Sequence, residues 1–351
     1  MALETNPQTH RPKLTRWYID TRNLTNSHST LTLLWSLRIP DQVASQRFYH
    51  LKDKHMSLAS NLLKYLYIHR TCRIPWEAIN ISRTADPHRR PCYIPDLSKL
   101  RKNEPLNWQP VNVEFNVSHQ AGMVALVGTP TPLSPTSGAG TQTEHTKPQV
   151  GVDITCVNER KGGKEEDRKL SVLREFVDIF SEVFSPGEIA AMKRVQVLSS
   201  GDTSTTLSDE QLVEYGYRLF YTYWALKEAY IKMTGEALLA PWLRELEFSN
   251  VVAPGPESGD EKFGEPYKEV KTTLRNKLVE DVRIEVAALE ADYLFATAAR
   301  GDGIGPTSPD CQDEDSWLPF TKIDFERDIR PCAEERCNCL TEQERLKFKQ
   351  G

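Results

Sequence analysis

Apolar and polar residues follow two successive patterns along the chain, and each pattern predicts strands together with a long helix. In the first, "LTRWYID" (14–20) is rich in aromatic and β-branched residues and predicts an opening strand. "WEAINISRT" and "VEFNVSHQ" predict strands and turns, and "MVALVG" predicts a short apolar strand. Between "LTRWYID" and "WEAINISRT", residues 40–69 show a helical pattern. Its buried face is formed by Leu58, Leu62, Tyr65, Leu66 and His69.

The second pattern repeats this mixture without a visible sequence repeat. "QVGVDI" predicts a strand, "LREFVDIFSEVF" and residues 217–233 predict helices, and "VRIEVAAL" with "DYLFATAA" predicts a closing hairpin. Strands and helices therefore come in two mixed groups and do not alternate regularly. That order favours an α+β fold over a doubly wound parallel sheet.

The segment 129–148 is rich in Pro, Ser, Thr and Gly and lacks apolar periodicity, so we expect a flexible insertion between two strands. We place the domain boundary in this segment because it separates the two groups of strands and helices. It gives an N-terminal half of residues 1–148 and a C-terminal half of residues 149–300. Beyond them the pattern is lost, and residues 301–351 are expected to form an irregular, poorly packed tail with one short helix near its end.

Composition narrows the class of protein. A chain of 351 residues with 39% hydrophobic residues can bury the cores of about two domains. Its net charge of −5 gives no general attraction to nucleic acid, so an anionic partner needs a local basic cluster. No apolar run has the length of a membrane span, and the first residues lack the apolar core of a secretory signal. We therefore expect a cytoplasmic protein that binds neither nucleic acid nor membrane.

The cysteines are unevenly spread. Their number, seven, is odd, which favours reduced thiols over a disulfide framework. The late group comprises Cys311, Cys332, Cys337 and Cys339. "CAEERCNC" (332–339) can be read as a metal-binding knuckle, but its spacing matches no standard zinc pattern and no histidine lies nearby in the sequence. We therefore expect a tail without metal.

Two acidic positions are candidates for metal binding. Asp153 in "VGVDIT" follows apolar strand residues, and an acid at a strand end is either a hard-metal ligand facing a cleft or a capping residue. "WALKEAYIKMTGEALL" places Glu228 one helical turn before Lys232. This pair is either a solvated ion pair, which adds roughly a few tenths of a kcal/mol, or a metal ligand beside a lysine that contacts the same phosphate.

Two further segments carry groups that bind anions. "FNVSHQ" places Ser118 and His119 side by side; no Gly-x-Ser-x-Gly elbow or partner acid supports a nucleophilic role, whereas both side chains can bind phosphate oxygens. The turn "RTADPHRRPCY" is either a phosphate clamp or a solvated loop, and its basic side chains are Arg83, His88, Arg89 and Arg90.

Taken in order, "RFYHLKDKHMSLASNLL", "RRPCY", "FNVSHQ", "GVDIT" and "WALKEAYIKMTGEALL" resemble the Sfp-type 4'-phosphopantetheinyl transferases. The resemblance runs from about residue 14 to residue 300 and is greatest to the broad-range fungal enzymes, which prime polyketide synthases, nonribosomal peptide synthetases and the aminoadipate reductase of lysine synthesis. It implies two similar α+β halves related by a pseudo-twofold axis, each a small antiparallel sheet with a long helix. Coenzyme A would bind between them, and one chain would form the whole cleft as a monomer.

The resemblance also implies roles for the candidate residues. Asp153 and Glu228 match ligands of Mg²⁺, with Mn²⁺ as an alternative, and Lys232 matches a lysine that contacts the phosphates of coenzyme A. Ser118 and His119 match a Ser-His pair at the same phosphates.

Four more positions match the family's binding residues. Arg90 matches the basic residue of its G-[KR]-P motif, and Arg89 stands where the glycine usually lies. Arg47 and Ser57 match positions at the 3'-phosphate and adenosine end of coenzyme A.

One departure concerns the metal site. Thr155 occupies a place where the bacterial archetype has a second acid, so water or another side chain such as Gln120 would complete the coordination. Glu188 in "SPGEIAAM" stands where the archetype has a further acid near the metal. The general base is then either Glu228 or Glu188, the latter acting through a water.

The implied activity is that of a holo-[acyl-carrier-protein] synthase. A serine hydroxyl of a carrier domain attacks the phosphorus next to pantetheine, and 3',5'-ADP leaves. The residues alone leave two other classes open: a metal-dependent hydrolase of coenzyme A or a nucleotide diphosphate, and a non-catalytic module that binds nucleotide or carrier protein.

Overall fold

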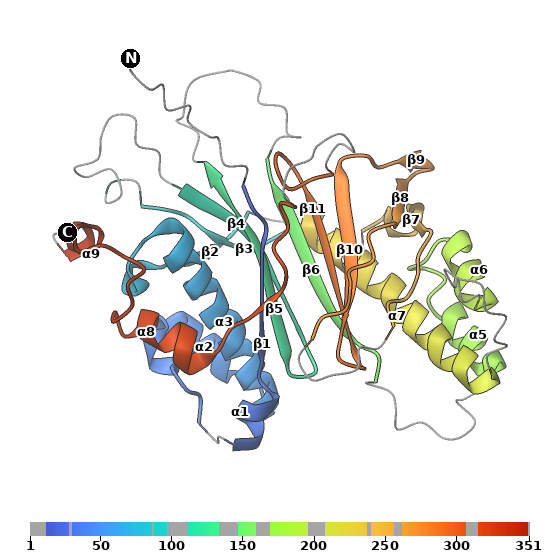
Figure 1. Cartoon of the computed structure of the whole chain (residues 1–351), viewed down its shortest axis with the longest axis horizontal. Coiled ribbons are helices and arrows are strands. Elements are labelled where there is room, and N and C mark those ends of the chain that lie inside the picture. The colour runs from blue at the N-terminus through green and yellow to red at the C-terminus, as the bar shows by residue number, and fades with distance from the viewer. Residues whose placement is uncertain are drawn as a thin grey trace, which may run out of the picture.

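The structure is a computed structural model that describes residues 12–27, 30–85, 88–96, 98, 111–132, 147–158, 169–195, 208–236, 240–255, 262–306 and 315–349. These residues form two α+β halves. Their sheets meet at the centre of the molecule, and each half carries a long helix on its outer flank (Figure 1). The predicted α+β fold class is confirmed. Within these ranges, no helix combines the length and apolar character that a bilayer span requires.

The N-terminal half is a four-stranded sheet covered by one long helix, α3 (Leu51–Cys72). Its strands, in spatial order, are β12 (Thr321–Lys322), β1 (Thr15–Asp20), β5 (Met123–Pro132) and β4 (Val111–Gln120). β4 and β5 are joined by a two-residue turn at Ala121 and Gly122, whose positive φ values of 48° and 88° suit a tight hairpin. The predicted buried face of α3 is confirmed, because all its positions from Leu58 to His69 named above are buried.

The C-terminal half repeats this plan with three antiparallel strands. They are β10 (Val282–Leu289), β11 (Tyr293–Arg300) and β6 (Gln149–Cys156). Helix α7 (Asp209–Thr234) covers the outer face of this sheet. The helix begins at a capping box, in which Ser208 and Gln211 bond each other's backbone N–H, and it ends at Gly235 with a φ of 86°.

Shorter elements surround these two units. In the N-terminal half they are α1 (Arg22–Ser27), α2 (Ile39–Gln46), β2 (Ile81–Arg83) and β3 (Pro91–Tyr93). In the C-terminal half they are α5 (Leu170–Asp178), α6 (Pro186–Arg194), β7 (Leu246–Ser249), β8 (Lys271–Leu274) and β9 (Lys277–Leu278). The helix predicted over residues 40–69 is therefore two helices, α2 and α3, separated by four residues.

The predicted insertion 129–148 begins too early. Residues 129–132 continue β5 and pair with β4, and Thr129 is buried. Pro130 and Pro132 suggested a loop, but β1 pairs with β5 only as far as Gly128, so the prolines lie where the strand has an open edge. Residues 133–146 lie outside the described ranges, and the domain boundary at residue 148 stays a prediction.

The expectation of a poorly packed tail is wrong for residues 315–349. β12 pairs with β1, and a π-helix (Phe325–Ile329), α8 (Arg330–Ala333) and α9 (Glu342–Lys349) follow. Side chains of this segment enter the apolar core beneath α3, among them Ile323, Phe325, Ile329 and Cys332. These apolar residues are spaced irregularly because the secondary structure changes every few residues along the segment. Hydrophobic periodicity therefore does not reveal its packing.

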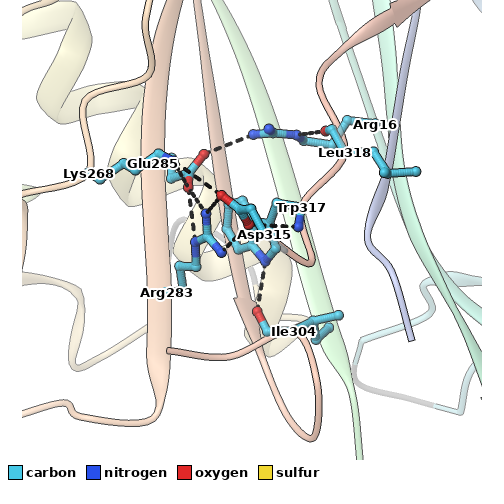
Figure 2. A network of polar contacts seen from close by, with 8 residues as sticks. All are labelled: Arg16, Lys268, Arg283, Glu285, Ile304, Asp315, Trp317 and Leu318. Atoms are coloured by element: carbon cyan, nitrogen blue, oxygen red, sulfur yellow. Dashed lines mark hydrogen bonds and ion pairs between the residues drawn. The ribbon is translucent and has the colours of Figure 1, made fainter. Parts of the chain in front are cut away.

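A polar network fastens the two halves together (Figure 2). Glu285 on β10 is buried and accepts from Arg16 of β1 at 3.0 Å, across the sheets. Arg283 bonds both Glu285 and Asp315, and Asp315 also accepts from Lys268 at 3.2 Å. The network contacts the apolar core between the two sheets, which includes Tyr18, Val127, Val152, Phe295 and Trp317.

Candidate functional site at the junction of the sheets

Two sheet edges, β4 and β6, lie side by side at the centre of the molecule. Side chains of β4 satisfy the backbone of β6: the Val152 N–H donates to Asn116 Oδ1 at 3.1 Å, and the Ile154 N–H donates to Ser118 Oγ at 3.4 Å. An open strand edge is thereby satisfied by side chains instead of a backbone ladder. The residue between Val152 and Ile154 is Asp153.

Asp153 is 5% exposed and is held by three donors. Its Oδ1 accepts from Ser118 Oγ at 3.1 Å and from Lys232 Nζ at 2.6 Å, and its Oδ2 accepts from Thr155 Oγ1 at 3.0 Å. Asp153 lies within β6 and not at its end, so its access to the junction comes from the neighbouring edge of β4. Thr155, at the place of the archetype's second acid, orients Asp153.

Glu228 lies on α7 beside this group. Burial raises its pKa, the nearby Lys232 opposes that rise, and the negative charge of Asp153 adds to it. Glu228 makes no hydrogen bond or ion pair with another residue of the described ranges. The i,i+4 ion pair with Lys232 is therefore not formed, because Lys232 reaches across to Asp153. We call Ser118, Asp153, Thr155, Glu228 and Lys232 the junction cluster.

Glu188 is not brought into the junction cluster. It belongs to the capping box of α6 with Ser185, and its carboxylate also accepts from the Phe248 N–H at 2.9 Å. Its remaining partner is Lys227, at 2.9 Å, in an ion pair that is almost fully buried. Burial raises the pKa of Glu188 in spite of that lysine. Both oxygens are thus engaged in structural contacts.

The basic turn meets the end of α7. Arg90 donates to Glu114 Oε1 at 2.8 Å, to Val150 O at 3.2 Å and to the helix-terminal Met233 O at 3.3 Å. Arg89 is exposed, and its φ of 45° lies in the left-handed region that favours glycine. The turn therefore has the backbone conformation of a glycine at this position.

A second basic group lies on the α3 side of β4. The side chain of His119 is exposed, but the protein around its ring displaces part of its water. This desolvation lowers its pKa, as do the positive charges of Lys232 and Lys64. Burial lowers the pKa of Lys64 to about 8, with Arg83 acting in the same direction and Asp41 opposing it. Several cations are therefore held close enough to repel one another, as at a site that receives a polyanion.

Comparison with known proteins decides the family. The model of "4'-phosphopantetheinyl transferase, N-terminal" matches residues 25–131, and that of the "4'-phosphopantetheinyl transferase superfamily" matches residues 149–287. The chain is 60% identical to the 4'-phosphopantetheinyl transferase NpgA of Emericella nidulans, over 97% of this chain and 100% of the relative. The chain belongs to the 4'-phosphopantetheinyl transferases.

Other relatives extend beyond one group of fungi. The transferase is 52% identical to 4'-phosphopantetheinyl transferase A of Aspergillus fumigatus, over 95% of this chain and 97% of the relative. It is 27% identical to the L-aminoadipate-semialdehyde dehydrogenase-phosphopantetheinyl transferase of Rattus norvegicus, over 85% of this chain and 81% of the relative. The family uses coenzyme A as donor and carrier proteins as acceptors.

The remaining predicted residues lie on the N-terminal half of the transferase. Arg47 is exposed at the end of α2, and its guanidinium lies 5.1 Å from the ring centroid of Phe48. Ser57 is half-buried on α3, and Gln120 ends β4. Neither Arg47 nor Ser57 makes a hydrogen bond or ion pair with the junction cluster.

Two residues of the transferase site were missed from the sequence. Asn116 supports the β6 edge, and Lys64 adds charge beside His119. Asn116 lies two residues before Ser118 on the same face of the strand, so strand periodicity alone could have found it. Lys64 lies between the apolar positions of the predicted helix, and only the packing of α3 on the sheet shows which groups it meets.

Proposed function

We propose that this transferase uses the junction cluster to move 4'-phosphopantetheine from coenzyme A to a serine of an apo acyl or peptidyl carrier domain. The observation that carries the proposal is Lys232 Nζ at 2.6 Å from Asp153 Oδ1, beside Glu228, where the two halves meet. Two acids and a cation in one group are what a pyrophosphate transfer needs, since its catalysis consists mostly of positioning and charge neutralisation.

The reaction exchanges one phosphorus–oxygen bond for another. The serine Oγ attacks the phosphorus next to pantetheine, and the bond from that phosphorus to the bridging oxygen breaks. 3',5'-ADP departs with the bridging oxygen, and the serine proton passes to a base. The protein must hold the pyrophosphate in line with the attacking oxygen and offset its charge.

Asp153 and Glu228 would hold a hard divalent cation. The fit is supported by two features: the acids come from separate elements, and Glu228 has a raised pKa with no hydrogen-bonded partner in the described ranges. Mg²⁺, or Mn²⁺ in its place, would neutralise charge on the pyrophosphate. Thr155 and Ser118 keep the Asp153 carboxylate oriented.

Glu228 is the proposed acceptor of the serine proton, directly or through a water. Burial and Asp153 raise its pKa in the metal-free protein. A bound cation would oppose that rise, which favours transfer of the proton through a water. Glu188, the other candidate from the sequence, is not retained, since it is 1% exposed and both its oxygens already accept hydrogen bonds.

Coenzyme A is proposed to lie along the basic groups of the N-terminal half. Lys232 and His119 would meet its phosphates, with Lys64 beside them, and Arg90 would support that surface. The 3'-phosphate and adenosine are assigned to the exposed Arg47 and to Ser57 on the next helix.

The proposed acceptors are the carrier domains of polyketide synthases, nonribosomal peptide synthetases and an aminoadipate reductase. The relatives support this choice, since one of them is named for L-aminoadipate-semialdehyde dehydrogenase. We propose a cytoplasmic monomer, in line with free thiols at all described cysteines and a junction cluster built within one chain.

The test is to incubate the protein with coenzyme A, Mg²⁺ and an apo carrier domain and to weigh the carrier by mass spectrometry. A carrier whose acceptor serine is replaced by alanine serves as the control. We expect the carrier to gain one phosphopantetheine and 3',5'-ADP to appear only with the intact acceptor. Cleavage of coenzyme A without carrier would instead identify a hydrolase.

A further inference from the structure

A second group of side chains that can bind a metal lies outside the junction cluster. It joins His69, in the last turn of α3, to Cys332 of α8 and to Cys337 and Cys339 of the loop that follows. The ligand atoms all lie within 4.8 Å of one another. His69, Cys332 and Cys337 are 2%, 1% and 9% exposed, so the group is part of the interior.

The distances are close to those of a closed tetrahedral site, and the Cys332–Cys339 sulfur pair has the expected separation. Cys332 Sγ lies 3.7 Å from Cys339 Sγ, and His69 Nε2 lies 3.2 Å from Cys337 Sγ. Zinc–sulfur bonds of about 2.3 Å and zinc–nitrogen bonds of about 2.0 Å place tetrahedral ligand atoms about 3.5–3.8 Å apart. A disulfide would instead require sulfur atoms about 2.0 Å apart.

The histidine is oriented as a metal ligand. Its Nδ1 lies 2.7 Å from the backbone oxygen of Ile74, which fixes the proton on Nδ1 and leaves the lone pair of Nε2 directed toward the sulfur atoms.

Positively charged side chains and a small pocket lie beside this group. Three thiolates and one Zn²⁺ leave a net charge of −1, and Arg70, Arg73 and Arg345 lie within electrostatic reach of His69. Arg345 also donates to the backbone oxygen of Cys337, which fixes the loop. A small pocket lined by His69, Cys337, Glu77 and Glu335, among other residues, lies beside the group.

We propose that His69, Cys332, Cys337 and Cys339 bind one structural Zn²⁺ that fastens the C-terminal segment to α3. Three soft thiolates with one imidazole select zinc over magnesium, so this site is distinct in chemistry from the junction cluster. His69 and Cys337 are 268 positions apart in the chain, and no sequence window brings them together. The fold supplies the histidine whose absence from the nearby sequence was one of our two reasons for expecting no metal.

The first measurement is the zinc content of the full-length chain, purified without a histidine tag and dialysed against a weak chelator. We expect inductively coupled plasma mass spectrometry to find one zinc ion per chain. Cys332→Ser and Cys339→Ser should lose it, whereas Cys92→Ser, a thiol outside the group, and Asp153→Ala, at the junction cluster, should keep it.

The second measurement does not depend on any variant folding correctly. Wild-type protein produced with Co²⁺ should show the visible absorption of tetrahedral cobalt together with thiolate charge-transfer bands. Wild-type protein that carries no zinc and gives no such spectrum would overturn the proposal. A Cys332–Cys339 disulfide, found by peptide mapping without reductant, would overturn it equally, as would full zinc retention in both serine variants.

Discussion

At the scale of single residues, the reach of Lys232 decides how the cluster is built. One helical turn separates it from Glu228, but its ammonium bonds Asp153 of the same half and Ser118 of the other half of the molecule. Glu228 is left with a raised pKa beside a second acid. The unliganded protein therefore holds two acids close together with one lysine to offset them, and a divalent cation would relieve that imbalance.

This imbalance predicts a stabilising but inactivating substitution, Glu228→Gln. The raised pKa of Glu228 means that the folded protein binds its proton more tightly than the unfolded chain, so stability is lost as the pH rises from the ordinary value of 4.5 through the raised one. Without metal at pH 7.5, Glu228→Gln should raise the melting temperature by about 1–3 °C. Below about pH 4 the difference should vanish. A lower melting temperature at pH 7.5 would contradict this assignment.

Arg89 and Arg90 should separate in a thermal unfolding experiment. Arg90→Ala leaves the half-buried Glu114 without its ion pair and should lower the free energy of unfolding by about 1–3 kcal/mol. We also expect a raised KM for coenzyme A with kcat changed less. Arg89→Gly should be neutral or stabilising by up to about 1 kcal/mol, since glycine adopts its positive φ freely. Equal effects of the two would show that the turn is only a solvated loop.

At the scale of elements, the contact between β6 and α7 sets the position of the cluster. A Cβ added at Gly151 would lie 2.1 Å from Ala229 O and 2.4 Å from Met233 N, so strand and helix meet backbone to backbone. Asp153 follows two residues later, and Lys232 precedes Met233. The glycine of the "GVD" segment therefore brings the acid within reach of the lysine.

Gly151→Ala should separate these two elements. We expect a loss of about 3 kcal/mol of stability and at least a tenfold fall in transfer rate, because the backbone of α7 cannot yield as a flexible side chain would. Gly255→Ala is the matched control, since an added Cβ there meets nothing within 4 Å. Denaturant unfolding and the carrier assay test both variants. Normal stability in Gly151→Ala would mean that the two backbones are less tightly packed than described.

Sequence patterns predicted these elements because each half follows a simple period. The buried face of α3, the strand holding Asp153 and the helix holding Lys232 all follow from spacing. Glu188 was assigned to the site from its position in a motif, although "SPGE" is also the signature of a capping box, the role that it has in the structure. Lys64 was missed because helical spacing shows on which face of a helix a residue lies but not which neighbouring residues it meets.

At the scale of the whole molecule, the halves depend on each other through the network of Figure 2. Glu285 is the buried acid that serves Arg16 and Arg283 together. Glu285→Gln should cost about 3 kcal/mol or more, because it leaves the buried Arg16 without a charged partner. Asp315→Asn also loses bonds to Arg283, but Asp315 is half-exposed, so its loss should stay near 1 kcal/mol. Equal losses in chemical denaturation would contradict the ranking.

The parts that the sequence did not predict are those assembled over long distances. His69 and the late cysteines are joined only after α3 and the C-terminal segment pack together. Asn116 acts on β6 only because two sheet edges meet. Local periodicity carries no information about which edges meet, whereas a motif preserves its own spacing, which is why Asp153, Glu228 and Lys232 could be named in advance.

The negative charge of Asp153 is essential to the proposed transfer, and its contribution can be measured as the rate of carrier modification by Asp153→Asn. Asparagine keeps the size of the side chain. Its one oxygen can accept from Ser118 and Lys232 in place of Oδ1, and its amide NH₂ can donate to Thr155 Oγ1 in place of Oδ2. With saturating coenzyme A and Mg²⁺, we expect a fall of about 10²–10⁴-fold in rate, with circular dichroism and melting temperature close to wild type. Asp281→Asn, at an exposed acid of the same half, should transfer normally. A rate for Asp153→Asn within about threefold of wild type, a change of less than about 1 kcal/mol in the activation barrier, would show that the transfer does not need this charge.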